Sequence, residues 1–113
     1  MRQLPLTAKA YATLDENGNG TASTGPLSSG EQWTGITAAV SVATNVNEAT
    51  CQLYAGAAAT PGYLQGATTW GSTGNSGPVG AAVKVGGNVW AVWTGGDPGA
   101  LATMTISGTK TVA

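Results

Sequence analysis

The fold is decided by one stretch, Ile36-Thr37-Ala38-Ala39-Val40-Ser41-Val42. Its larger apolar residues occupy every second position and alternate with small or polar residues. This is the period-two pattern of a β-strand with one buried face, whereas a helix repeats its apolar residues every three or four positions. The stretch therefore predicts a strand that packs one face against a hydrophobic core.

The same alternation recurs on both sides of this stretch. It predicts strands over residues 6–14, 21–24, 51–55, 81–85, 89–93 and 102–107, with one short strand between 60 and 78. Residues that favour turns separate these segments. The turns at 15–20 and 86–88 predict hairpins, which would pair 6–14 with 21–24 and 81–85 with 89–93.

No window of the sequence shows sustained helical periodicity. Seven or eight short strands with glycine-rich turns are typical of an all-β protein, and residues 1–113 are expected to form a single antiparallel β-sandwich domain. We favour a jelly-roll-like sandwich over an immunoglobulin-like one. The two differ in strand connections, and the alternation does not reveal which strands pair.

The composition excludes several classes of partner. The chain has 113 residues, a net charge of -1 and 8% charged residues, against roughly 25% in a typical globular protein. Its four bases are scattered rather than clustered, so we expect no nucleic-acid partner. No run approaches the roughly 18 apolar residues of a membrane span, and no apolar signal stretch follows Met1, so we expect neither membrane insertion nor secretion.

The sequence also contains few residues that could catalyse a reaction. There is no histidine, and neither a Gly-x-Ser-x-Gly nor a Ser-x-x-Lys motif is present. The single cysteine, Cys51, is expected to be a small core residue, with Tyr54 on the outward face of the same strand. Glu31, Glu48 and Asp97 are the carboxylates that could form a glycosidase-like pair, but all three lie at strand edges or turns. We expect a protein that is not an enzyme and binds no cofactor.

One motif resembles the start of a calcium-binding loop. In Asp15-x-Asn17-x-Asn19-Gly20 the side-chain oxygens have the spacing of loop positions 1, 3 and 5. Position 12, where a bidentate glutamate belongs, is Pro26. Because tight turns use the same residues for local hydrogen bonds, the motif predicts a turn and no metal site.

The aromatic residues are the remaining candidates for a functional surface. Trp90 and Trp93 are separated by an odd number of positions on one predicted strand, so their side chains should point to opposite faces. The candidate interface residues are Trp90, Val92, Trp93, Trp33, Trp70 and Tyr63. In a sugar-binding module, Trp70, Tyr63 or Trp33 would instead form a stacking platform, and any of the aromatic residues could simply fill the core.

Several short segments carry a resemblance to a known group of proteins. The segments are Leu14-Asp15-x-x-Gly18-Asn19-Gly20-Thr21, Gly25-Pro26-x-x-x-Gly30-Glu31-Gln32-Trp33-Thr34, Cys51-x-x-Tyr54-x-Gly56, the run from Ala91 to Ala100, and Gly108-Thr109. Together they resemble small β-rich structural proteins encoded by tailed phages of actinobacteria.

The resemblance implies a non-enzymatic virion component, such as a capsid decoration, collar or tail-surface protein, assembled in the host cytoplasm. Its expected partners are the major capsid or tail proteins and further copies of itself, because repeated weak contacts on a symmetric particle gain avidity. The alternative is a carbohydrate-binding module or a host-surface adsorption accessory.

Overall fold

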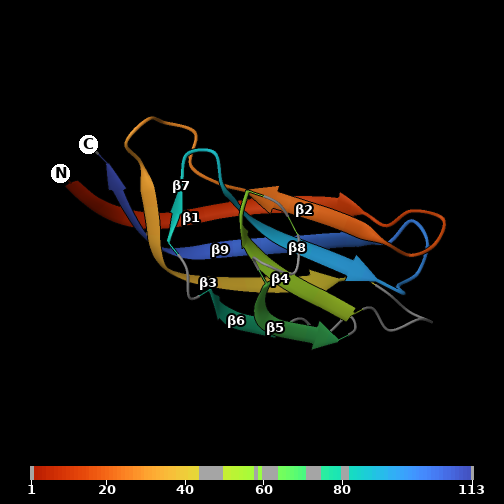
Figure 1. Ribbon diagram of the computed structural model, residues 1–113. Coiled ribbons are helices and arrows are strands. Elements are labelled where there is room, and N and C mark those ends of the chain that lie inside the picture. The colour runs from red at the N-terminus through yellow and green to blue at the C-terminus, as the bar shows by residue number, and fades with distance from the viewer. Residues whose placement is uncertain are drawn as a thin grey trace.

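The chain forms a β-sandwich. The computed structural model describes residues 2–43, 50–57, 59, 64–70, 75–79 and 82–112, with the backbone alone for 64–70 and 75–79. Within these ranges there are nine strands and no helix (Figure 1). The strands are β1 (Arg2–Thr13), β2 (Gly20–Thr24), β3 (Gln32–Val42), β4 (Thr50–Gly56), β5 (Leu64–Trp70), β6 (Asn75–Val79), β7 (Val83–Lys84), β8 (Asn88–Thr94) and β9 (Leu101–Val112).

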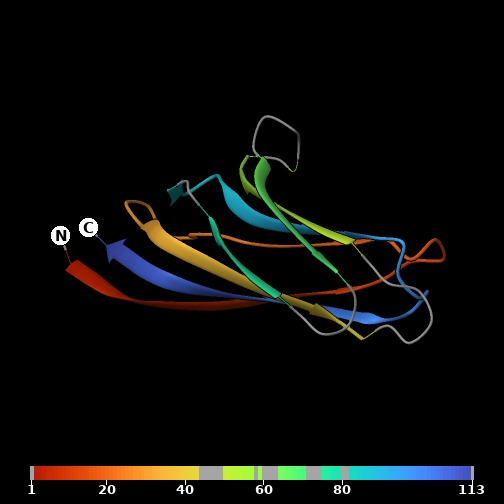
Figure 2. The ribbon, with the colours of Figure 1, turned by 90° about the horizontal axis from the view of Figure 1, so that it is seen from below.

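The strands form two antiparallel sheets that pack face to face (Figure 2). One sheet has the order β1-β9-β3-β6, with the short β7 also paired to β3, and we call it the long sheet. The other has the order β2-β8-β4-β5, and we call it the short sheet. The molecule measures 47 × 24 × 21 Å, and its long dimension follows the twelve-residue strands β1 and β9.

The strand pairing is that of a jelly roll. When the two-residue β7 is set aside, the first strand pairs with the last, the second with the second last, β3 with β6 and β4 with β5. In an immunoglobulin sandwich the first two strands belong to one sheet. Here β1 and β2 lie in opposite sheets, so the jelly-roll prediction is confirmed.

The core lies between the sheets and consists mostly of small and medium side chains. The alternation predicted over residues 36–42 is confirmed, because its even-numbered side chains are all buried and its odd-numbered ones all exposed. Burial alternates in the same way along β9, which is next to β3 in the long sheet, and along β8, which belongs to the short sheet. Their buried residues are Val89, Ala91, Trp93, Ala102, Met104 and Ile106.

Both predicted hairpins are wrong, although their turns exist. The turn after β1 carries the chain from the long sheet to the short sheet, where β2 pairs with β8 instead of β1. Likewise β7 pairs with β3, while β8 pairs with β2 and β4. Turn residues specify a change of direction, and the pairing partner is chosen by the two-sheet core.

Two strand boundaries also differ from the prediction. The segment from 60 to 78 contributes two strands, β5 and β6, instead of one, and the strand predicted at 81–85 shrinks to Val83–Lys84. The turn predicted at 45–48 lies outside the described residues.

Strand β3 begins earlier than the alternation suggested because it contains a bulge. Its register with β9 shifts between Thr34 and Thr37, and Gly35 adopts a φ of +58° there. A bulge adds one residue to one strand. The inward-facing residues are therefore odd-numbered on one side of the bulge and even-numbered on the other. This explains why odd-numbered Trp33 is buried on the same strand as even-numbered Ile36.

Candidate interaction surface

The two tryptophans of β8 point to opposite faces of the short sheet, as predicted. Trp93 is 1% exposed and belongs to the core, whereas Trp90 is half-buried on the outer side. The indole Nε1–H of Trp90 donates a hydrogen bond to the carbonyl oxygen of Gly56 at 3.0 Å. This bond fixes the orientation of the ring on the sheet surface.

The residues around Trp90 form an uncharged outer face. Val92 lies two positions further along β8 and is also half-buried. Tyr54 on β4 is opposite Trp90 in the register, and Ser23 on β2 is opposite it on the other side. We call this surface the Trp90 face. Its described residues are Thr21, Ser23, Gln52, Tyr54, Trp90 and Val92.

Tyr54 is more enclosed than its predicted outward position suggests. Its side chain is only 9% exposed, and its hydroxyl donates to the side-chain oxygen Oε1 of Gln52 at 2.9 Å. The outward direction is therefore confirmed, but exposure does not follow from it. The bond pairs the polar groups of Gln52 and Tyr54 with each other next to Trp90.

The structure corrects two of the candidate interface residues. Trp33 is 4% exposed in the core, and its Nε1–H donates to Oε2 of Glu31 at 2.7 Å. Trp33 and Trp93 therefore cannot offer their rings to a partner or a sugar. Trp70 ends β5, where its backbone is in register with Thr50, but its side chain and the whole of Tyr63 lie outside the described residues.

The calcium-like motif folds as a tight turn. Asp15 Oδ1 accepts the backbone N–H groups of Asn17 at 2.8 Å and Asn19 at 3.0 Å. Asn19 Oδ1 in turn accepts the N–H of Gly95 at 3.3 Å. The oxygens that would open a calcium loop thus stabilise the turn and its contact with the β8–β9 connection.

The carboxylates considered for catalysis do not come together in the part of the chain that can be described. Glu31 precedes β3 at the end of the molecule that holds Arg2, while Asp97 lies in the β8–β9 connection at the other end. Glu48 is outside the described residues. Across the described ranges, no group of three or more His, Cys, Asp or Glu side chains is placed to hold a metal ion, and Cys51 is buried and outside any disulfide.

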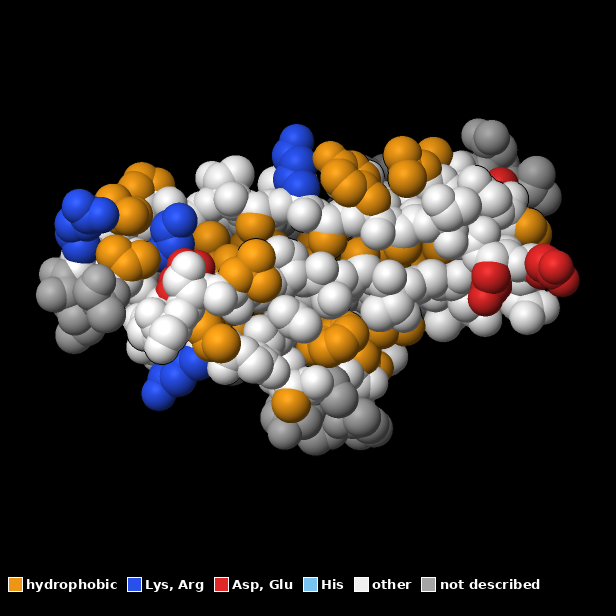
Figure 3. All heavy atoms as spheres, turned by 90° about the horizontal axis from the view of Figure 1, so that it is seen from above, with side chains coloured by type: hydrophobic (Ala, Val, Ile, Leu, Met, Phe, Trp, Pro, Cys, Tyr) orange, Lys and Arg blue, Asp and Glu red, His pale blue; other side chains and the backbone are white. Residues whose placement is uncertain are grey.

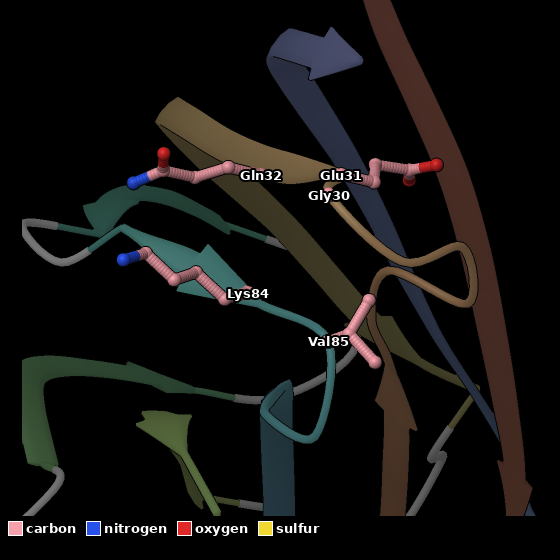
Figure 4. Close-up of a pocket in the computed structure, with 5 residues that line it drawn as sticks. All are labelled: Gly30, Glu31, Gln32, Lys84 and Val85. Atoms are coloured by element: carbon pink, nitrogen blue, oxygen red, sulfur yellow. The ribbon is translucent and has the colours of Figure 1, made fainter. Parts of the chain in front are cut away.

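One open pocket, of about 320 Å³, lies beside the start of β3. It is lined by Gly30, Glu31, Gln32, Lys84 and Val85. Figure 4 shows the side chains of Gln32 and Lys84 extending to one side and that of Glu31 to the other. Its polar groups do not converge on a common point, so the pocket lacks the arrangement that orients a small-molecule substrate.

Comparison of the chain with protein-family models, curated proteins and solved structures found no match. Among the described residues, no helix has the length and hydropathy needed to cross a membrane. The geometry of the Trp90 face is therefore the main structural guide to function.

Proposed function

We propose that this protein is a non-enzymatic structural component of a tailed-phage virion, a capsid decoration or other particle-surface protein. It binds the major capsid or tail proteins through the Trp90 face, and it associates with further copies of itself. In this role it stabilises the assembled particle and needs no cofactor.

The observation that carries this proposal is the partial exposure of Trp90 and Val92 on an uncharged sheet face. The solvent-facing side of an antiparallel sheet is normally polar. On the long sheet it carries the exposed Thr7, Lys9 and Thr37 together with the exposed Tyr11 and Leu101 near one end. Aromatic residues without neighbouring charges are enriched at the centres of protein interfaces. The Trp90 face has this composition.

The fold and the sequence add independent support. Jelly rolls occur in viral capsid proteins and in lectins, so the fold is compatible with a virion protein without selecting it. The sequence resemblance to phage structural proteins favours the virion. The lack of histidine in the whole chain is unfavourable to most acid–base chemistry.

The proposal is tested by placing a charge on the Trp90 face. Val92→Glu and Trp90→Glu should each abolish binding to purified particles, measured by co-sedimentation. Thr7→Glu, an exposed position on the opposite sheet, is the matched control and should bind normally. Circular dichroism and thermal melting confirm that each variant is folded.

If the folded Val92→Glu protein binds particles as the native chain does, the Trp90 face is not the contact surface. If antibodies against the chain fail to label the surface of purified phage particles that carry it, the virion assignment is wrong.

A carbohydrate-binding role is the second candidate, and the fixed ring of Trp90 favours it. A ring held by a hydrogen bond to Gly56 can stack on a sugar without further loss of side-chain freedom. In that case the native chain is monomeric, and a glycan quenches the fluorescence of the native protein but not that of Trp90→Ala.

A further inference from the structure

The charges of this chain are divided between the two ends of the molecule. Arg2 is opposite Val112 in the register, Lys110 is opposite both Leu4 and Trp33, and Lys84 is opposite Gln32. Three of the four bases therefore lie at one end, where Glu31 is engaged with the indole of Trp33. We call this the basic end.

The opposite end carries three of the four acids in the described part of the chain. Asp15 and Glu16 are exposed in the turn after β1, and Asp97 lies in the adjacent β8–β9 connection. We call this the acidic end. Figure 3 shows most basic side chains near one end of the elongated body, with an acidic group among them, and further acidic side chains at the other end. Lys9 lies between the two ends on the exposed side of β1.

Each end also exposes large apolar side chains. At the basic end, Leu27 is 94% exposed at the tip of the β2–β3 loop, and Val85 is 48% exposed in the β7–β8 turn. Near the acidic end, Leu101 is 52% exposed and Tyr11 is 59% exposed. These four are the large hydrophobic residues exposed in the described part of the chain. An almost fully exposed leucine adds nothing to the fold of a monomer.

Each end contains a close contact between two loops. At the acidic end, the N–H of Gly96 donates to the carbonyl oxygen of Gly18 at 3.0 Å, which joins the two turns. At the basic end, the backbone at Gly25 approaches Gly87 and Asn88 so closely that a Cβ would not fit, which ties the β2–β3 loop to the β7–β8 turn. Preformed surfaces of this kind lose little conformational entropy when they dock.

We propose that copies of this chain associate end to end, with the acidic end of one copy on the basic end of the next. Opposite charges then face each other, and the exposed Leu27 and Val85 of one copy can be covered by the exposed Tyr11 and Leu101 of the next. Such a contact is heterologous, so it forms open rows or closed rings in which every copy points the same way. It uses neither Trp90 nor Val92 and does not depend on the function proposed above.

The test uses charge reversal at each end. Lys84→Glu alters the basic end and Glu16→Lys alters the acidic end, and both positions are exposed. Each variant alone should weaken association, measured by sedimentation velocity, by about two- to tenfold in Kd. An equimolar mixture of the two variants should recover it, because each supplies the end that the other lacks. Lys9→Glu is the matched control and should associate as the native chain does.

A second variant tests the apolar part of the contact. Leu27→Ser should leave the melting temperature unchanged and weaken association by about tenfold or more, because an exposed leucine matters only if a partner covers it. Association should also fall several-fold between low and high salt, because exposed charges are screened.

Three results would overturn the proposal. The first is that the sedimentation coefficient of the native chain does not rise with concentration. The second is that the mixture of Lys84→Glu and Glu16→Lys associates no better than either variant alone, and the third is that Leu27→Ser does not weaken association. A chain that associates end to end and still tolerates Val92→Glu on particles would refute the function proposed above while leaving this inference intact.

Discussion

Replacing Gly18 by alanine should separate the two turns at the acidic end. Gly18 has a φ of +76°, and a Cβ at this position would overlap the carbonyl oxygen of Gly96. The backbones of the β1–β2 turn and the β8–β9 connection therefore meet without room for a methyl group. The added methyl must push the two turns apart.

The size of the effect follows from the interactions that are lost. Alanine in the left-handed region costs about 1–2 kcal/mol relative to glycine. Separating the turns also removes the hydrogen bond from Gly96 to Gly18 and the one from Gly95 to Asn19. At about 1 kcal/mol each, the free energy of unfolding should fall by about 3–4 kcal/mol in total. The melting temperature should fall by roughly 12–16 °C.

Gly99→Ala is the matched control. Gly99 has a similar φ of +79°, but no heavy atom lies within 4 Å of an added Cβ. Gly99→Ala should therefore lower the free energy of unfolding only by the cost of placing alanine in the left-handed region, about 1–2 kcal/mol. Urea unfolding followed by tryptophan fluorescence gives both free energies. If Gly18→Ala is no more destabilising than Gly99→Ala, the described contact between the turns is wrong.

Four further predictions concern the tryptophans of β8, the turn at Asp15 and Cys51. Trp93→Ala should lower the free energy of unfolding by about 3–5 kcal/mol, and Trp90→Ala by clearly less, because only Trp93 is fully buried; equal losses in urea titrations would contradict this. Asp15→Ala should destabilise the protein by about 1–3 kcal/mol because it removes the acceptor of two turn amides. A chelator should not change the melting temperature of the native chain, and a fall that calcium reverses would show that the turn holds a metal. Cys51 should react with a thiol reagent only as fast as the protein unfolds, and rapid labelling under native conditions would disprove its 0% exposure.

The positions of the strands could be predicted from the sequence, but their pairing could not. Alternation along β3 and β9 reports which side chains face the core, and the structure confirms it. It contains no information on partners, because a jelly roll pairs strands that are far apart in the chain. The turn at Asp15 has hairpin chemistry, yet it connects two sheets, because β9 takes the position beside β1 that a hairpin would give to β2.

The candidate site was predictable to a similar extent. Because Trp90 and Trp93 are an odd number of positions apart, their side chains must lie on opposite faces of the strand. This spacing alone does not say which of the two faces the core. The burial of Trp33 depends on the bulge at Gly35, and no residue pattern upstream of Ile36 signals it. The enclosure of Tyr54 arises from its neighbours on the sheet and its bond to Gln52, which a single strand does not reveal.

The pairing of β1 with β9 constrains when this protein can fold. Arg2 lies opposite Val112, and β9 separates β1 from β3, so β1 cannot join the rest of the long sheet until β9 has been synthesised. A ribosome adds about 5–20 residues per second, so β1 waits several seconds for its partner. Contacts of such long sequence separation also make folding slow, on the order of milliseconds to seconds. A nascent or truncated chain without β9 would expose β1 and β3 as open edges, which are prone to aggregation. Only chains that carry this strand could therefore offer a finished surface to an assembly.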